Sequence, residues 1–112
     1  MKVRLAEVAH SRAGDKGTLV TLSLIPYEPR HYPDLCRLVT ADLVRDHLAG
    51  RVRGQVLRHE MPNLPALLFV CRRDPDDTVT ASLYLDTHAK SLSSALLELI
   101  VDLPDAPEGH PA

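Results

Sequence analysis

Alternating or uniformly apolar stretches predict a sheet of four to five strands. The clearest is Thr78–Asp86, where apolar and polar residues alternate strictly, as in a strand with one buried face and one solvated face. The other predicted strands are Val3–Ala9, Thr18–Ile25, a strand that begins near Gly54, and Ala66–Cys71. We expect the first two to run antiparallel and to be joined by the polar segment between them.

Apolar residues recur at helical spacing in the remaining stretches. Pro33 suits the first turn of one helix, and Thr40 can cap a second helix over Ala41–Leu48, which Gly50 would end. One bent helix or two short helices both fit this pattern. Ser91 can cap a last helix, Ser91–Val101, that closes the core.

The order of these elements predicts an α+β fold. Helices with one apolar stripe can cover one face of an antiparallel sheet, so we expect a two-layer sandwich of ferredoxin-like type with two to three helices. Asp74–Asp77 is a predicted turn. Residues 1–103 are predicted to form one domain, and the polar, proline-rich tail 104–112 is predicted to be disordered.

Composition narrows the class of partner. The 112 residues carry a formal net charge of -2, which gives no global attraction to nucleic acid or to an anionic membrane. With one Phe, three Tyr and no Trp, the chain lacks the aromatic stacking platform of a sheet that binds RNA. We therefore expect no nucleic-acid partner.

Two further observations indicate a cytoplasmic protein. No apolar run reaches the roughly 18 residues that a membrane span needs, and Met1–His10 lacks the apolar centre of a signal peptide. Cys36 and Cys71 lie far apart, each within an apolar-periodic segment. Buried free thiols are therefore expected rather than a disulfide.

The polar segment His10–Gly17 is the first candidate site. It is predicted to be a tight, exposed connection between two strands, because its polar residues and glycines interrupt the apolar pattern. Two glycines would let backbone N–H groups converge while two cations bind a phosphate or carboxylate; these residues are Gly14, Gly17, Arg12 and Lys16. A plain turn, in which Asp15 bonds backbone N–H groups, is the simpler interpretation of the spacing.

Acid–base chemistry in this segment would use His10 and Asp15. A carboxylate on one ring nitrogen fixes the tautomer of a histidine and leaves the other nitrogen free as a base. Ser11 adjoins His10, but neighbours along a strand point to opposite faces, so we expect Ser11 to cap or stabilise the turn.

A second polar connector lies between the clearest strand and the last helix. It contains Asp86, His88 and Lys90, which could be displayed at the end of the strand or could be a solvated link. No HxH, HxxxH or CxxC spacing occurs, so we predict no metal site and no cofactor.

Several spaced segments together resemble the small ferredoxin-fold domain of the acyclic terpene utilisation (AtuA-like) family. The segments are Ala9–Gly17, Val52–Gly54, Ser82–Asp86 and His88–Leu97. In that family the domain follows a larger, catalytic-looking domain or stands as a separate short chain, and the family is linked to catabolism of acyclic terpenes through coenzyme A thioesters. The resemblance therefore implies a larger AtuA-like partner and an acyl-CoA or other anionic ligand.

The chain departs from the family pattern at two positions. Family members commonly continue the first polar segment as Gly-Asp and place an asparagine four residues after the glycine, where this chain has Thr18 and Thr21. The departure removes one carboxylate and one amide, which calls into question any activity that depends on them.

Arginines add a further candidate site. Two basic strips are expected on neighbouring predicted strands, formed by Arg51, Arg53, Arg58, Arg72 and Arg73. They could attract a coenzyme A phosphate or an acidic partner surface, and solvated faces or cross-strand pairing with Glu60 or Asp74 explain them equally well.

These observations favour an accessory domain that docks on a larger partner and contributes the first polar segment to an acyl-thioester or anion site. In this hypothesis His10 and Asp15 would be catalytic, and the substrate-binding residues would be Ser11, Arg12, Gly14, Lys16, Gly17, Asp86, His88 and Lys90. An independent acid–base enzyme acting on coenzyme A esters and a structural homo-oligomerisation domain are the alternatives.

Overall fold

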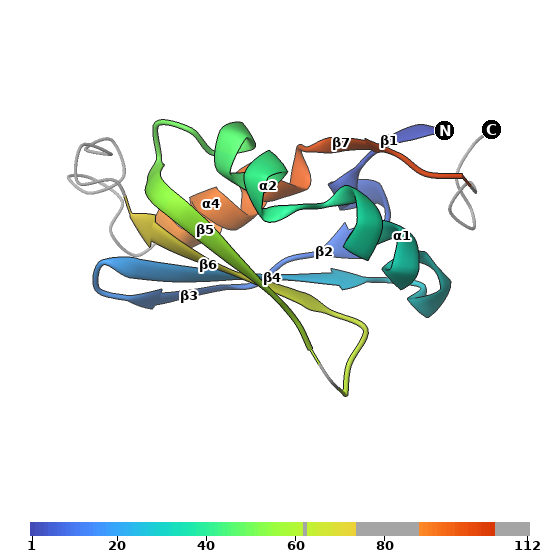
Figure 1. Ribbon diagram of the computed structural model, residues 1–112, viewed down its shortest axis with the longest axis horizontal. Helices are drawn as coiled ribbons and strands as arrows, with labels where there is room; N and C mark the ends of the chain where they lie inside the picture. Colours follow the sequence, from blue (N-terminus) through green and yellow to red (C-terminus); the bar gives the residue numbers. More distant parts are fainter. Residues whose placement is uncertain (62, 74–87, 105–112) are drawn as a thin grey trace.

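An antiparallel sheet with helices on one face forms the body of the protein (Figure 1). The computed structural model describes residues 1–61, 63–73 and 88–104. The predicted turn Asp74–Asp77, the predicted strand Thr78–Asp86 and the tail after Pro104 lie outside the described residues. In chain order the elements are β1 Lys2–Arg4, η1 Leu5–Glu7, β2 Ala9–His10, β3 Ala13–Lys16, β4 Leu19–Pro26, η2 Pro29–His31, α1 Tyr32–Leu38, α2 Ala41–His47, β5 Val52–Glu60, β6 Leu67–Arg73, α4 His88–Leu97 and β7 Ile100–Asp102.

The main sheet has the strand order β2-β4-β6-β5, with β3 also paired to β4. All of its ladders are antiparallel, and a separate ladder joins β1 to β7. α4 lies over β3 and β4, and α2 lies over β5, so the helices and the β1–β7 ladder form a second layer (Figure 1). The predicted α+β fold, with an antiparallel sheet and two to three helices, is confirmed.

β2 and β3 form one interrupted edge strand along β4. Ala9 pairs with Pro26 and Lys16 pairs with Leu19, which is the same register at both ends. The only turn is a two-residue loop whose first residue, Gly17, has a φ of 73°, as a type II′ hairpin requires. The prediction that His10–Gly17 is a connection is wrong, because a polar edge strand and a loop have similar sequences.

The two short helices follow their sequence signals. Pro33 lies in the first turn of α1, and the Leu43 N–H donates to Thr40 Oγ1 over 3.1 Å at the start of α2. A third signal, Gly50, has a φ of 91° just after α2. The chain therefore has two short helices rather than one bent helix.

The two ends of the described chain pair with each other. The predicted strand Val3–Ala9 is divided by the 3-10 turn η1, where the Arg4 N–H donates to Glu7 Oε2 over 2.7 Å. The predicted helix Ser91–Val101 begins earlier, at His88, and ends at Leu97, so its extension to Val101 is wrong. Three of the residues beyond it form β7, which pairs with β1, and this pairing satisfies backbone groups that a longer helix would have used.

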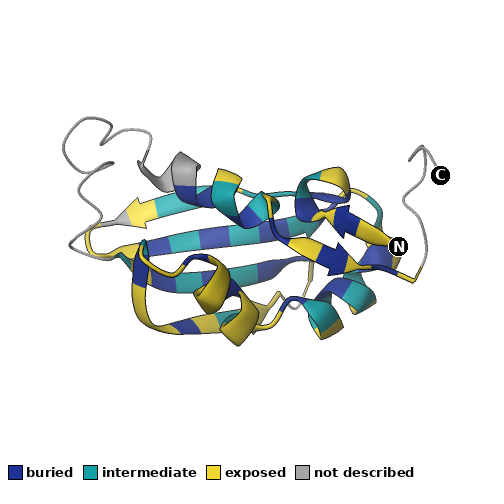
Figure 2. Cartoon of the chain, turned by 90° about the horizontal axis from the view of Figure 1, so that it is seen from above, coloured by how far each residue is buried: buried dark blue, intermediate teal, exposed yellow. Residues whose placement is uncertain are grey.

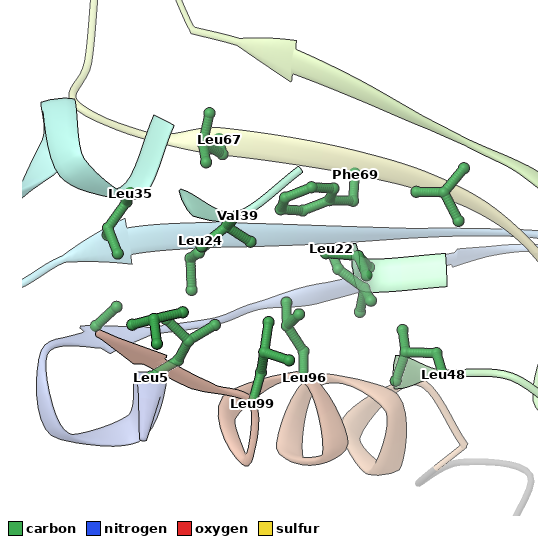
Figure 3. Close-up of a cluster of buried hydrophobic side chains, with 14 of the residues drawn as sticks. Leu5, Leu22, Leu24, Leu35, Val39, Leu48, Leu67, Phe69, Leu96 and Leu99 are labelled. Atoms are coloured by element: carbon green, nitrogen blue, oxygen red, sulfur yellow. The ribbon is translucent and has the colours of Figure 1, made fainter. Parts of the chain in front are cut away.

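Burial follows the alternation along the strands (Figure 2). In β4 the residues Val20, Leu22 and Leu24 are buried against the second layer. Figure 3 shows the resulting core, in which side chains of the sheet meet those of the helices and of η1. Cys71 is a buried free thiol, as predicted, while Cys36 is free and only half-buried.

Candidate functional site

The edge strand distributes the predicted site residues over both faces of the sheet. Asp15 lies opposite the buried Val20, on the face that the helices cover. Alternation places Ser11 on this same face and His10, Arg12 and Gly14 on the other. The side chain of Ser11 is partly buried, and its Oγ has no hydrogen-bond partner among the described residues.

The structure does not bring His10 and Asp15 together. The His10 ring stacks on Tyr27, with ring centroids 5.4 Å apart, whereas Asp15 accepts a hydrogen bond from Arg73 Nη2. Five residues along a strand correspond to roughly 16 Å. An oriented base made of these two residues would need a contact that the strand geometry prevents.

Gly14 is a strand residue, so its N–H belongs to the ladder with Thr21 rather than to an anion-binding loop. A Cβ built on Gly14 would lie 2.7 Å from Thr21 Oγ1, closer than real Cβ atoms approach. The expectation that Gly14 helps backbone N–H groups converge on an anion is therefore wrong. The glycine instead allows a close cross-strand approach at one of the two positions where the chain departs from the family pattern.

The end of the sheet near the β3–β4 turn gathers three arginines. Arg53 of β5 lies directly opposite Arg72 of β6, which confirms that arginines of neighbouring strands meet. These two arginines, with Arg73 and the turn residues Gly17 and Thr18, line a cavity of about 250 Å³.

Arg73 is held by the hairpin. Its guanidinium is paired with Asp15, and its backbone N–H donates to Thr18 O over 2.8 Å. The β3–β4 turn is thereby fixed to the end of β6. Asp15, predicted as a catalytic group, is paired with Arg73 in the structure.

Arg58 belongs to a different region. Its Nη1 donates to Cys36 O over 3.1 Å, and its Nη2 lies 3.3 Å from Glu60 Oε2. The pairing with Glu60 runs along β5 rather than across strands, and Arg58 stabilises the contact between β5 and α1 instead of joining the other arginines.

The second predicted connector is partly helical. His88 and Lys90 lie in the first turn of α4, while Asp86 lies outside the described residues. The side chains of Lys16, His88 and Lys90 are likewise outside the described part of the chain.

One face of the sheet has no layer over it among the described elements (Figure 1), and we call it the open face. Its apolar members come from three neighbouring strands, and they are Leu19, Ile25, Leu57, Leu68 and Val70. Its strand arginines are Arg53 and Arg72, and alternation from β3 adds Arg12, which lies between β2 and β3. Sequence reasoning missed this surface, although the apolar residues on both sides of Thr18–Ile25 were a signal that both faces of that strand meet apolar neighbours.

Within residues 1–61, 63–73 and 88–104, no three His, Cys, Asp or Glu side chains gather as a metal site would require. Nor is any helix of this described part long and apolar enough to cross a membrane.

The fold and this site define a ferredoxin-like α+β module with one open sheet face and an arginine-lined corner. The chain belongs to the AtuA ferredoxin-like domain family, whose model matches residues 3–102. The resemblance inferred from the sequence is therefore confirmed. Comparison with curated proteins and with solved structures finds no match.

Proposed function

We propose that the chain is an accessory module that docks through its open face on a larger AtuA-like protein and contributes the β3–β4 end of its sheet to a site for an acyl-thioester or another anionic substrate. The observation that carries the proposal is the open face itself. A helix layer covers one side of the sheet, and apolar side chains continue on the other.

The exposure of these side chains supports docking. Leu19 is 39% exposed and Leu57 48%. Tyr27, which follows β4 and stacks on the open-face residue His10, extends the open face and is 62% exposed. Contiguous exposed apolar surface is costly in water and commonly marks an interaction site. A hollow of about 230 Å³ between Leu19, Leu57 and Val70 gives the surface relief into which a partner side chain could insert.

The charge of the open face favours a different protein, rather than a second copy of this chain, as the docking partner. The described strand positions of the open face include Arg53 and Arg72 and neither Asp nor Glu, although the whole chain has a net charge of -2. A second copy docked through the same face would bring the same arginines, and no carboxylate from these positions, into the interface. A partner with apolar residues surrounded by carboxylates complements the face, since complementary potentials give specificity.

The arrangement of His10 favours this role over independent acid–base catalysis. A free-standing enzyme of the kind considered above needs an oriented base, and the carboxylate predicted to orient His10 is paired with Arg73 instead. A contributing module needs only a docking face and a group that binds the substrate.

Co-expression tests the proposal. A tagged chain and an AtuA-like protein from the same genome should purify together, and Leu57→Glu should abolish the complex because it places a carboxylate in the apolar centre of the face. The matched control is Ile100→Glu on β7, where the side chain is 61% exposed in the other layer, and it should leave the complex intact. The proposal fails if the wild-type chain binds no such partner, if both variants behave alike, or if light scattering shows a homodimer lost in Leu57→Glu.

A further inference from the structure

The arginines at the corner of the open face are arranged unfavourably for the protein alone. Arg53 and Arg72 are exposed and directly opposite each other, and neither forms an ion pair with a residue in 1–61, 63–73 or 88–104. Like charges directly opposite in an antiparallel ladder are destabilising. An anion between the two guanidinium groups would remove this repulsion.

The charge count of the cavity indicates the kind of anion. On the open face the cavity has two arginines, Arg53 and Arg72, whereas the guanidinium of Arg73 is paired with Asp15 on the face that the helices cover. Among the described residues, the open-face side of the cavity therefore has two positive charges. A phosphate monoester carries nearly two negative charges at neutral pH, whereas a carboxylate carries one.

The geometry agrees with this count. A guanidinium binds phosphate through two parallel N–H donors, which an ammonium cannot do. The cavity, at about 250 Å³, is smaller than the roughly 300–1,000 Å³ typical of sites that enclose a whole small molecule. It therefore fits the charged head of a ligand whose remainder lies outside.

We infer that Arg53 and Arg72 bind a dianionic phosphate group, present as a monoester or diphosphate on a small molecule. The inference deepens the proposed function by naming the chemical class that the corner recognises. It rests on the proposed function only for the expectation that the phosphate belongs to an acyl-thioester carrier. Because the test below uses the chain alone, failure to dock on a partner would leave its result unaffected.

Calorimetric titration at constant ionic strength tests the inference with inorganic phosphate, coenzyme A and acetate as probes. Phosphate or coenzyme A should bind saturably at one site, and acetate at least about tenfold more weakly. Arg53→Gln and Arg72→Gln should each weaken binding about tenfold or more, as expected for losing hydrogen bonds to a charged group. Arg37→Gln is the matched control, because this exposed arginine lies on α1 at the opposite end of the molecule and should bind within about twofold of wild type (Figure 1).

The outcomes separate the sources of the anion. If coenzyme A binds more tightly than inorganic phosphate, the site is supported and its phosphate belongs to a larger carrier molecule. If the two probes bind equally tightly, the site is supported and its ligand is free phosphate. The inference is overturned if neither probe binds, if acetate binds as tightly, or if Arg37→Gln weakens binding as much as the corner variants do. Thermal unfolding of each variant confirms that a loss of binding is not a loss of fold.

Discussion

Thr21 occupies the space that a side chain at Gly14 would need. The two residues are cross-strand partners, and Thr21 Oγ1 lies 3.5 Å from Gly14 O. The glycine is thus required by the packing of the hairpin and not by a loop conformation, since only Gly17, Gly50 and Gly54 among the described residues have positive φ.

Gly14→Ala is expected to destabilise the protein by about 1–3 kcal/mol, because overpacking a close contact has this cost. Rotation of the Thr21 side chain cannot relieve the clash easily, since a β-branched residue is stiff at χ1. Chemical denaturation measures the change in the free energy of unfolding.

The double variant Gly14→Ala, Thr21→Ala provides the control. It should be more stable than the two single changes predict, by about 1 kcal/mol, because residues in direct contact couple. If the stability changes of the two single variants simply add, the close approach to Thr21 does not restrict the side chain at position 14.

The two thiols should react at different rates. Cys71 is fully buried in the core, whereas Cys36 on α1 is half-buried. Ellman's reagent at pH 8 is expected to modify Cys36 first and Cys71 only as the protein unfolds. Cys36→Ser identifies the faster phase, and equal rates for both thiols would contradict the burial of Cys71.

Stability should fall at alkaline pH through Cys71. Burial raises the pKa of the Cys71 thiol from 9.0 to about 11, so the folded protein holds this proton more tightly than the unfolded chain. The stability that the raised pKa contributes to the folded protein is fully present below about pH 9. It is lost as the pH rises toward 11, and the total loss in the free energy of unfolding is roughly 2–3 kcal/mol.

Comparison with Cys71→Val isolates this effect. The difference in unfolding free energy between wild type and Cys71→Val should change between pH 8.5 and 10.5. Burial raises the pKa of Tyr32 to about 12, and since both proteins share this group, its titration cancels in the comparison. A difference that stays constant with pH would mean that the thiol ionises equally well in the folded state.

Arg53→Thr is expected to stabilise the chain alone by about 0.2–1 kcal/mol at low salt, because it removes one of two like charges that lie opposite each other. High salt should reduce the gain, since these side chains are exposed. Urea denaturation at two salt concentrations checks both statements. A variant less stable than wild type at low salt would show that Arg53 makes a favourable contact in the free chain.

The elements that the sequence predicted best have strong local signals. Thr40 supplies a cap and Pro33 a first turn, and both helices form there because these effects act within a few residues. The first helix and the second are separated by a residue with extended backbone, Thr40 itself, which explains why the pattern does not continue as one bent helix.

The polar edge strand and the last helix were predicted less well because tertiary contacts determine them. Nothing in the composition of Ala13–Lys16 indicates a strand, and its structure depends on pairing with β4. In the same way, Val101 has helical spacing but pairs with Val3 from the other end of the chain. Such long-range pairing overrides local propensity.

The candidate site depends on which face each residue occupies. Sequence adjacency suggested one site containing His10 and Asp15, yet alternation along β2 and β3 places them on opposite faces. The pairing of Arg53 with Arg72 depends on a register that shifts at the bulge between Arg53 and Leu57, which the sequence does not reveal.

Hydroxyl-radical footprinting of the chain, alone and in complex with an AtuA-like partner, tests the docking face most directly. Leu57 and Tyr27 on the open face should be oxidised in the free chain and protected in the complex, while Ile100 on β7 should be oxidised equally in both. Protection of Ile100 with no change at Leu57 and Tyr27 would contradict the proposal that the open face binds the partner.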